Sequence, residues 1–142
     1  MRFSSVLLVA ATAILGASLG AQSVTPTPNC PSCAEWNAPH APFKLFGNTY
    51  YVGTNGLGAL LVTSPQGHVL VGGALPESAQ QIAASIRALG FRVEDIRVIV
   101  NSHVHFDHAG GIADLQRWSG AEVVASAASV PGLRTGDVGH LQ

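Results

Sequence analysis

The sequence has no excess of charge of either sign. Its 142 residues include seven Lys or Arg and eight Asp or Glu, which gives a formal net charge of −1 at pH 7. It also has no run of like charges, no internal repeat and no heptad pattern. Since proteins that bind nucleic acids usually present a basic patch, this composition argues against a nucleic-acid partner.

The sequence also lacks an apolar run long enough to span a membrane comfortably. Its apolar stretch at residues 6–15 follows Arg2 and leads into the small residues of positions 16–21. A basic start, a short apolar centre and a small-residue exit are typical of a secretory signal peptide, here residues 1–21. The alternative is a membrane anchor, which the Ala, Ser and Thr content of the stretch disfavours.

We therefore expect the mature chain to be exported, to the periplasm or outside the cell. No membrane attachment is expected after the signal is cleaved. A mature chain of about 120 residues is long enough for one small hydrophobic core.

Cysteine is scarce, with only Cys30 and Cys33 in a Cys-Pro-Ser-Cys segment. A single pair near the mature N-terminus, in an oxidising compartment, favours a local disulfide over a redox pair or a structural zinc site. Pairing with a cysteine outside this sequence is the alternative. No catalytic role is expected for either thiol.

Residues 22–42 are rich in Pro, Thr, Ser and Asn, which predicts an extended leader without a core of its own. Two hairpins of short strands are predicted next. The first joins 43–46 to 49–52 through a Gly-Asn turn, and the second joins 59–63 to 68–71 through a Ser-Pro-Gln-Gly turn.

The spacing of apolar residues then changes to that of a helix over 78–89. Ser78 and Gln81 resemble a capping box at its start, and Gly90 marks its end.

Strand and helix signals alternate from there on. Residues 98–100 are a continuous apolar run, as in a strand buried on both faces. A second helix is predicted over 111–118, ending at Gly120, and another strand over 122–125. This alternation of strands and helices predicts an α/β fold.

Three histidines and an aspartate follow the predicted strand 98–100, in the segment His103-Val104-His105-Phe106-Asp107-His108. Imidazole and carboxylate groups are ligands that zinc accepts. Because alternate residues of an extended chain point the same way, His103, His105 and Asp107 should converge, with His108 directed to a neighbouring position. The pattern predicts a two-metal site at the carboxyl end of a buried strand, where open α/β sheets place their active sites.

Each of these side chains has an ordinary explanation when taken alone. Asp107 could cap the following helix, and His103 or His105 could be a half-buried histidine without a metal. Together those explanations require four coincidences, so the metal site is favoured. The other histidines have no such neighbours in the sequence: His40, His68 and His140.

The motif and the strand before it resemble the metallo-β-lactamase superfamily. The surrounding sequence narrows the resemblance to class B, subclass 3 metallo-β-lactamases, over essentially all of the mature chain. The segments that carry it are 36–39, 47–54, 60–67, 74–79, 86–91 and 101–111. A histidine at position 108 fits that subclass, whereas subclass 1 enzymes usually have a different residue there.

The resemblance implies that residues 43–142 are the N-terminal half of a four-layer αβ/βα sandwich, a mixed sheet with helices on one face. It implies two zinc ions per complete site, the first bound by His103 and His105 and the second by Asp107 and His108. It also implies hydrolysis of the β-lactam amide of penicillins, cephalosporins and carbapenems. In that reaction zinc activates a water, and Asp107 acts in catalysis by orienting it.

Two departures from the family pattern bear on activity. Each zinc normally takes one further histidine from the second half of the sandwich, and two protein ligands would hold an ion weakly. The family also usually has Asp-Gly where this sequence has Gly72-Gly73, and that Asp is expected to support the metal site. We therefore expect an incomplete chain, inactive by itself, with an apolar sheet face that lowers its solubility.

Two other functions stay open. Another hydrolase of the superfamily, acting on thioesters or lactones, would use the same motif, although the export signal and the 36–78 sequence argue against it. A non-catalytic, degenerate zinc-binding product is the other, suggested by Gly72 and by the ligands that the motif does not supply.

Overall fold

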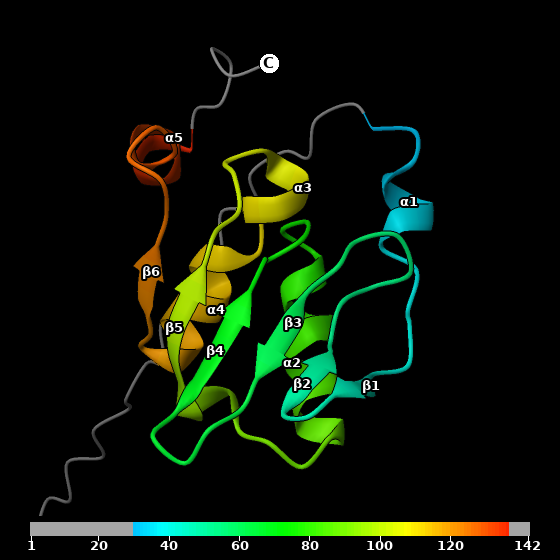
Figure 1. Ribbon diagram of the computed structural model, residues 1–142. Helices are drawn as coiled ribbons and strands as arrows, with labels where there is room; N and C mark the ends of the chain where they lie inside the picture. The colour runs from blue at the N-terminus through cyan, green and yellow to red at the C-terminus, as the bar shows by residue number, and fades with distance from the viewer. Residues whose placement is uncertain (1–29, 137–142) are drawn as a thin grey trace, which may run out of the picture.

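The computed structural model describes residues 30–136, which form an α/β fold around one six-stranded sheet (Figure 1). The strands are β1 (Phe43–Phe46), β2 (Thr49–Tyr51), β3 (Leu60–Val62), β4 (His68–Val71), β5 (Ile96–Val100) and β6 (Glu122–Val124). The helices are α1 (Cys33–Trp36), α2 (Ser78–Ala88), α3 (Phe106–Ala109), α4 (Ile112–Ser119) and α5 (Val130–Thr135), with a 3-10 helix η1 (Val93–Asp95). The predicted signal peptide, residues 1–21, lies outside the described residues.

The sheet is mixed, as predicted, and its strands lie in sequence order. Strands β1 to β4 pair antiparallel, whereas β5 pairs parallel with both β4 and β6. Helix α2 with η1 connects β4 to β5, and α3 with α4 connects β5 to β6. Such helical connections are what parallel neighbours require.

The predicted strand positions are confirmed to within two residues. Strands β1 and β4 have the predicted bounds, and β2, β3 and β6 are shorter by one residue at one or both ends. Strand β5 begins earlier than predicted, at Ile96. The helices α2 and α4 are confirmed as well, and the glycines after them, Gly90 and Gly120, have φ of 86° and 72°, a conformation that favours glycine at a helix end.

One face of the sheet is covered by α2 and α4. Leu61, Leu70 and Ile99 are register partners across β3, β4 and β5, and all three are fully buried. They share one hydrophobic core with Ile86 of α2 and Leu115 of α4. The helices therefore lie over the face that carries Ile99, and their apolar sides close the core.

The opposite face of the sheet is apolar but only partly buried, and we call it the open face. It consists of Leu60, Val62, Val69, Val71, Val98, Val100 and Val124, which are register partners across β3 to β6. Val124 is 46% exposed, and the others are of intermediate burial. The prediction that 98–100 is buried on both faces is therefore wrong, because no described helix covers the open face.

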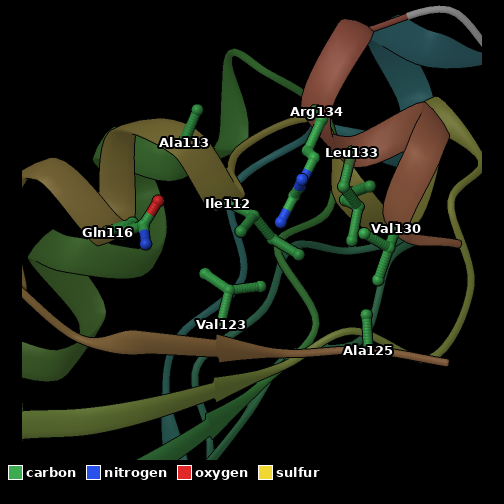
Figure 2. Close-up of a pocket in the computed structure, with 9 residues that line it drawn as sticks. Ile112, Ala113, Gln116, Val123, Ala125, Val130, Leu133 and Arg134 are labelled. Carbon is green, nitrogen blue, oxygen red and sulfur yellow. The ribbon is translucent and has the colours of Figure 1, made fainter. Parts of the chain in front are cut away.

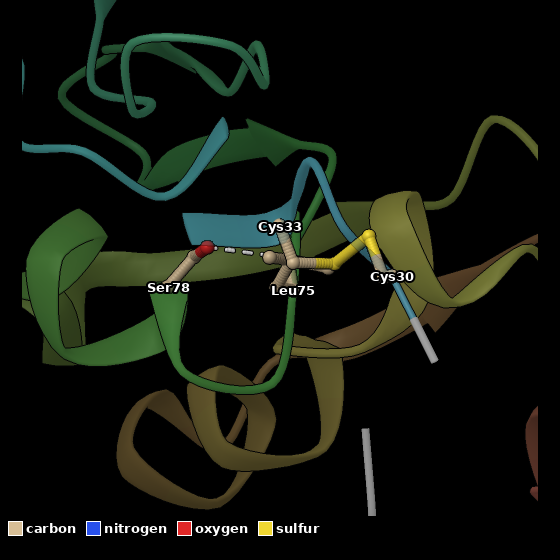
Figure 3. The surroundings of a disulfide bond; sticks show 4 residues. All are labelled: Cys30, Cys33, Leu75 and Ser78. Atoms are coloured by element: carbon tan, nitrogen blue, oxygen red, sulfur yellow. Dashed lines mark hydrogen bonds between the residues drawn. A yellow bond between two sulfur atoms is a disulfide. The ribbon is translucent and has the colours of Figure 1, made fainter. Parts of the chain in front are cut away.

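The segment predicted as an extended leader is partly helical. Residues 33–36 form the short helix α1, and Trp36 packs against the core. Cys30 and Cys33 form a disulfide across the start of this helix, with their Cα atoms 5.3 Å apart (Figure 3). The predicted local pairing is confirmed. The prediction of an extended chain is wrong at α1, because the partly buried Trp36 packs against the core there.

Ser78 and Gln81 do not form the predicted capping box. The N-cap of α2 is Glu77, which has no side-chain capping hydrogen bond. The Ser78 hydroxyl instead accepts from the Leu75 N–H (3.2 Å, Figure 3) and donates to Oδ1 of Asn37 (2.6 Å). Gln81 Nε2 donates to the Asn37 carbonyl at 2.8 Å. Both polar side chains thus fasten the end of α1 to α2.

Helix α5 was not predicted, and it lies beyond β6 beside the upper end of the sheet (Figure 1). Among residues 30–136, no helix has the length and apolar character needed to cross a bilayer.

Candidate metal centre

The histidine-rich motif leaves the carboxyl end of β5 and turns at once into α3. His105 is the N-cap of this helix, and its carbonyl accepts from the N–H groups of His108 (3.0 Å) and Ala109 (2.8 Å). The prediction that 103–107 is extended is therefore wrong from Phe106 onward. The chain coils there because the next residues pack against the loop after β4.

This turn brings His103, Asp107 and His108 together. Each offers one ligand atom, and these atoms all lie within 4.8 Å of one another. Nε2 of His108 is 3.3 Å from Oδ2 of Asp107, and the ring centroids of His103 and His108 are 4.0 Å apart. Helix α3 directs His108 toward His103, and the expectation that His108 serves a neighbouring metal position stays a prediction.

His105 lies beside this group. Its ring centroid is 4.7 Å from that of His103, and the two ring planes meet at 73°. All four predicted ligands are therefore neighbours, with His103 in ring contact with both His105 and His108. The division of these ligands between two ions stays a prediction.

Two residues that the sequence did not single out hold His103 in place. Asn101, which is 4% exposed, donates from Nδ2 to the His103 carbonyl at 2.7 Å. The Ser102 hydroxyl lies 3.1 Å from Nδ1 of His103, which leaves Nε2 for a metal ion. Their position directly before the motif was the one available signal. Oδ1 of Asn101 is buried without a hydrogen-bond partner in the described part of the chain.

Gly110 and Gly111 allow the motif to approach the loop that follows β4. The Gly73 N–H donates to the His108 carbonyl at 2.9 Å, within this contact. A Cβ on Gly111 would clash with the carbonyl oxygen of Gly73, and a Cβ on Gly110 would clash with Cδ of Pro76. The glycines of the motif are thus required by close backbone packing.

Gly72 directly follows β4 and has a φ of 83°. Its N–H donates to the Val100 carbonyl at 3.0 Å, and a Cβ added there would lie 3.0 Å from the Gly58 carbonyl oxygen. The position therefore favours glycine by conformation. It carries no carboxylate toward the motif, in contrast to the Asp that the resemblance implies.

Local electrostatics favour the neutral form of His103. Burial lowers the pKa of His103, the neighbouring His108 and His105 lower it further, and Asp107 acts in the opposite direction. Since neutral imidazole is the form that binds a metal, this shift keeps His103 ready as a ligand at neutral pH.

The donor set fits zinc. Zinc accepts imidazole nitrogen and carboxylate oxygen, and its catalytic sites usually take three protein ligands. His103, Asp107 and His108 meet that number for one ion. The ring contacts of His40, with Phe43 and Tyr51, and of His68, with Phe91, lie elsewhere, and His140 is outside the described residues.

Comparison with known proteins gives one family and a consistent set of structures. The family described as the metallo-beta-lactamase superfamily matches residues 44–141. The structure is similar to Rm3 metallo-beta-lactamase, at 62% identity and a TM-score of 0.76, over 79% of this chain and 42% of that one. It is also similar to MEM-A1, a subclass B3 metallo-beta-lactamase isolated from a soil metagenome library, at 60% identity and a TM-score of 0.71, over 72% and 39% of the two chains.

A third structure, metallo-beta-lactamase SMB-1, is 52% identical with a TM-score of 0.70, over 71% of this chain and 39% of that one. A probable metallo-hydrolase of Mycobacterium tuberculosis is 53% identical over 36 residues, which are 25% of this chain and 12% of that protein. The chain thus spans 39–42% of the length of these three solved structures.

Proposed function

Because this chain belongs to the metallo-beta-lactamase superfamily, we propose that it supplies metal ligands to a zinc-dependent hydrolase of β-lactam antibiotics. The observation that carries the proposal is the group His103, Asp107 and His108, with ligand atoms within 4.8 Å of one another. The similarity to Rm3 and MEM-A1 supports β-lactams as the substrate class, and we propose penicillins, cephalosporins and carbapenems as its members. Antibiotic resistance would be the biological result, and the periplasm or the exterior the proposed place of action.

The residues have distinct tasks in this proposal. When bound, zinc would polarise the lactam carbonyl and lower the pKa of a water to about 7. His103, His105 and His108 would bind through imidazole nitrogens, with Nε2 of His103 left open by the contact of Nδ1 with Ser102. Asp107 would accept a hydrogen bond from the attacking water and orient it toward the carbonyl carbon.

The backbone around the site would hold these groups still during the reaction. Asn101 fixes the His103 carbonyl, and Gly73 fixes the His108 carbonyl, at 2.7 Å and 2.9 Å. Both contacts act on main-chain atoms, so they restrict where each imidazole can stand without competing for its ring nitrogens. Such preorganisation is what ligand sets for catalytic metals require.

The motif alone does not complete two catalytic zinc sites. Such sites usually take three protein ligands each, and the motif offers His103, His105, Asp107 and His108. We therefore propose that the isolated chain binds zinc weakly and has little activity, and that the hydrolase is a longer protein. The 39–42% coverage of the similar structures supports this view.

Calorimetric zinc titration of the purified chain tests the ligand assignment. His108→Asn and Asp107→Asn should each weaken binding by more than about tenfold, because each removes a donor to the ion. His40→Asn is the matched control, since His40 contacts Phe43 and Tyr51 and is not part of the group. Equal affinity in all three variants would overturn the assignment.

Turnover by the full-length protein tests the substrate class. We expect hydrolysis of a chromogenic cephalosporin that EDTA abolishes and added zinc restores. The second candidate is another hydrolase of the superfamily, which would use the same motif on thioesters or lactones. Turnover of a glutathione thioester with the cephalosporin left intact would select it. Zinc binding without turnover of any of these substrates would select a non-catalytic product.

A further inference from the structure

A second concave site lies next to α4, outside the histidine-rich motif. A cavity of about 370 Å³ opens between α4, β6 and α5 (Figure 2). This volume falls in the range of pockets that hold small molecules. None of the four motif residues lines it, so it is separate from the metal centre.

Most of the side chains that line the cavity are apolar. Ile112 comes from α4, Val123 from β6, and Val130 and Leu133 from α5, with alanines between them. Figure 2 shows Ile112, Val123 and Leu133 directed toward a common space. Walls of this kind favour a ligand with an apolar body, because binding removes hydrocarbon surface from water.

One positive charge faces this apolar space. The Arg134 side chain extends from α5 toward Ile112, across the opening (Figure 2). The other polar lining residue, Gln116, already donates from Nε2 to the Ala121 carbonyl at 3.3 Å. The guanidinium group is therefore the charged contact that the lining offers to a ligand.

The charge of Arg134 has no acidic partner within residues 30–136. Asp114 pairs with Arg117, and Glu94 and Asp95 pair with Arg92. A guanidinium group binds a carboxylate through two parallel hydrogen bonds. A single guanidinium matches one negative charge, whereas a phosphate dianion would keep a charge for which the lining offers no second cationic side chain.

We propose that this cavity binds a small monocarboxylate with an apolar body, its carboxylate on Arg134 and its hydrocarbon part against Ile112, Val123 and Leu133. The site goes beyond the proposed hydrolase function, because it requires no metal and uses none of the motif side chains. The cavity wall includes Ala109, which directly follows His108. An occupant would therefore contact the end of α3.

The test uses the purified chain in EDTA, so that carboxylate binding at the metal centre through an ion is excluded. The probe is 4-phenylbutanoate, and its neutral analogue 4-phenylbutanamide has the same body without the charge. Methyl NMR spectra should show saturable shifts at Val123, Val130 and Leu133. Arg134→Gln should weaken carboxylate binding by about tenfold, since it removes a charge-assisted contact.

Two further variants test whether binding depends on this cavity or on general charge and hydrophobic effects. Ala125→Leu should reduce binding by filling the cavity, because Figure 2 shows Ala125 directed into it. Arg117→Gln removes the same charge from α4 outside the cavity and should leave binding unchanged. The proposal is overturned by equal binding of acid and amide, by shifts confined to the open face, or by no shifts at millimolar probe.

Discussion

The backbone N–H of Gly73 donates to the carbonyl oxygen of His108 across 2.9 Å. This bond joins the loop after β4 directly to the metal motif after β5. It acts on the main chain of a predicted ligand, so the position of His108 depends on a residue far from the motif in sequence. The two glycines that follow, Gly110 and Gly111, make this approach possible.

Gly111→Ala should lower the free energy of unfolding by about 1–3 kcal/mol, as overpacking does. The added Cβ would clash with the Gly73 carbonyl and stand 3.2 Å from Cβ of Ala79. Urea unfolding followed by circular dichroism measures the change. Gly58→Ala is the control, because a Cβ there meets nothing within 4 Å, and it should change stability by less than about 0.5 kcal/mol. The same loss in both variants would contradict the packing argument.

Gly72→Asp should have two opposed effects. The φ of 83° is unfavourable for a residue with a Cβ, so stability should fall by about 1–2 kcal/mol. Zinc affinity should rise by about tenfold or more, because a carboxylate would again support the metal ligands. Gly72→Asn has nearly the same shape without the charge, and should lose stability with no gain in zinc affinity. Matching affinities in the two variants would refute a supporting role for the carboxylate.

Asn37→Ala should destabilise the protein by about 1–3 kcal/mol, the usual effect of leaving a buried hydroxyl without its partner. Ser78 is fully buried, and its hydroxyl donates to Oδ1 of Asn37 at 2.6 Å. Thermal unfolding of the variant measures the loss. Asn55→Ala removes an exposed asparagine from the neighbouring loop and should be nearly neutral. A neutral Asn37→Ala would mean that the end of α1 does not stabilise α2.

The local elements could be predicted because their signals lie within a few residues. The turn at Gly47-Asn48 and the helix stops at Gly90 and Gly120 depend on conformations that glycine favours, and the structure has positive φ at all three glycines. The interactions of Ser78 could not be predicted in the same way. Its partner Asn37 lies on a different element, so a local capping pattern was the wrong explanation.

The candidate site, too, could be predicted only in its local features. The motif alone predicts that four side chains are neighbours, and the structure places them together: His103, His105, Asp107 and His108. The directions of these side chains could not be predicted from the sequence, because α3 is short and is held by contact with the loop after β4. A helix of one turn has little stability of its own, so its sequence carries no clear periodic signal.

The metal-free protein should show an NMR titration of His103 centred below the ordinary value of 6.5. Asp107→Asn should lower the pKa of His103 further, because the carboxylate raises it, and His108→Gln should raise the pKa by removing a positive neighbour. Since the pKa is lower in the folded state, the unfolded chain takes up the proton first as the pH falls. Stability should therefore decline as the pH drops below about 6.5. A raised pKa of His103 in Asp107→Asn, or a lowered one in His108→Gln, would contradict this electrostatic account.

The open face should bind the dye 8-anilinonaphthalene-1-sulfonate and promote self-association, since large apolar patches do both. Val69 and Val98 are register partners at its centre, and the double variant Val69→Thr, Val98→Thr keeps their shape while adding hydroxyls. Dye fluorescence and light scattering should both fall in this variant. Phe46→Ser, which removes a residue that is 86% exposed on β1, is the control and should change them less. A larger effect of Phe46→Ser would place the surface that binds the dye and self-associates at β1.

The contact between Gly73 and His108 also bears on the order in which the chain assembles. Strands β1 to β4 pair through short hairpins, whereas this contact waits until α2 and β5 have been positioned. Contacts between distant parts of a chain close more slowly than local ones. The ligand group should therefore form late in folding, after the hairpins. Zinc that is present from the start of refolding would have no assembled site to bind until then.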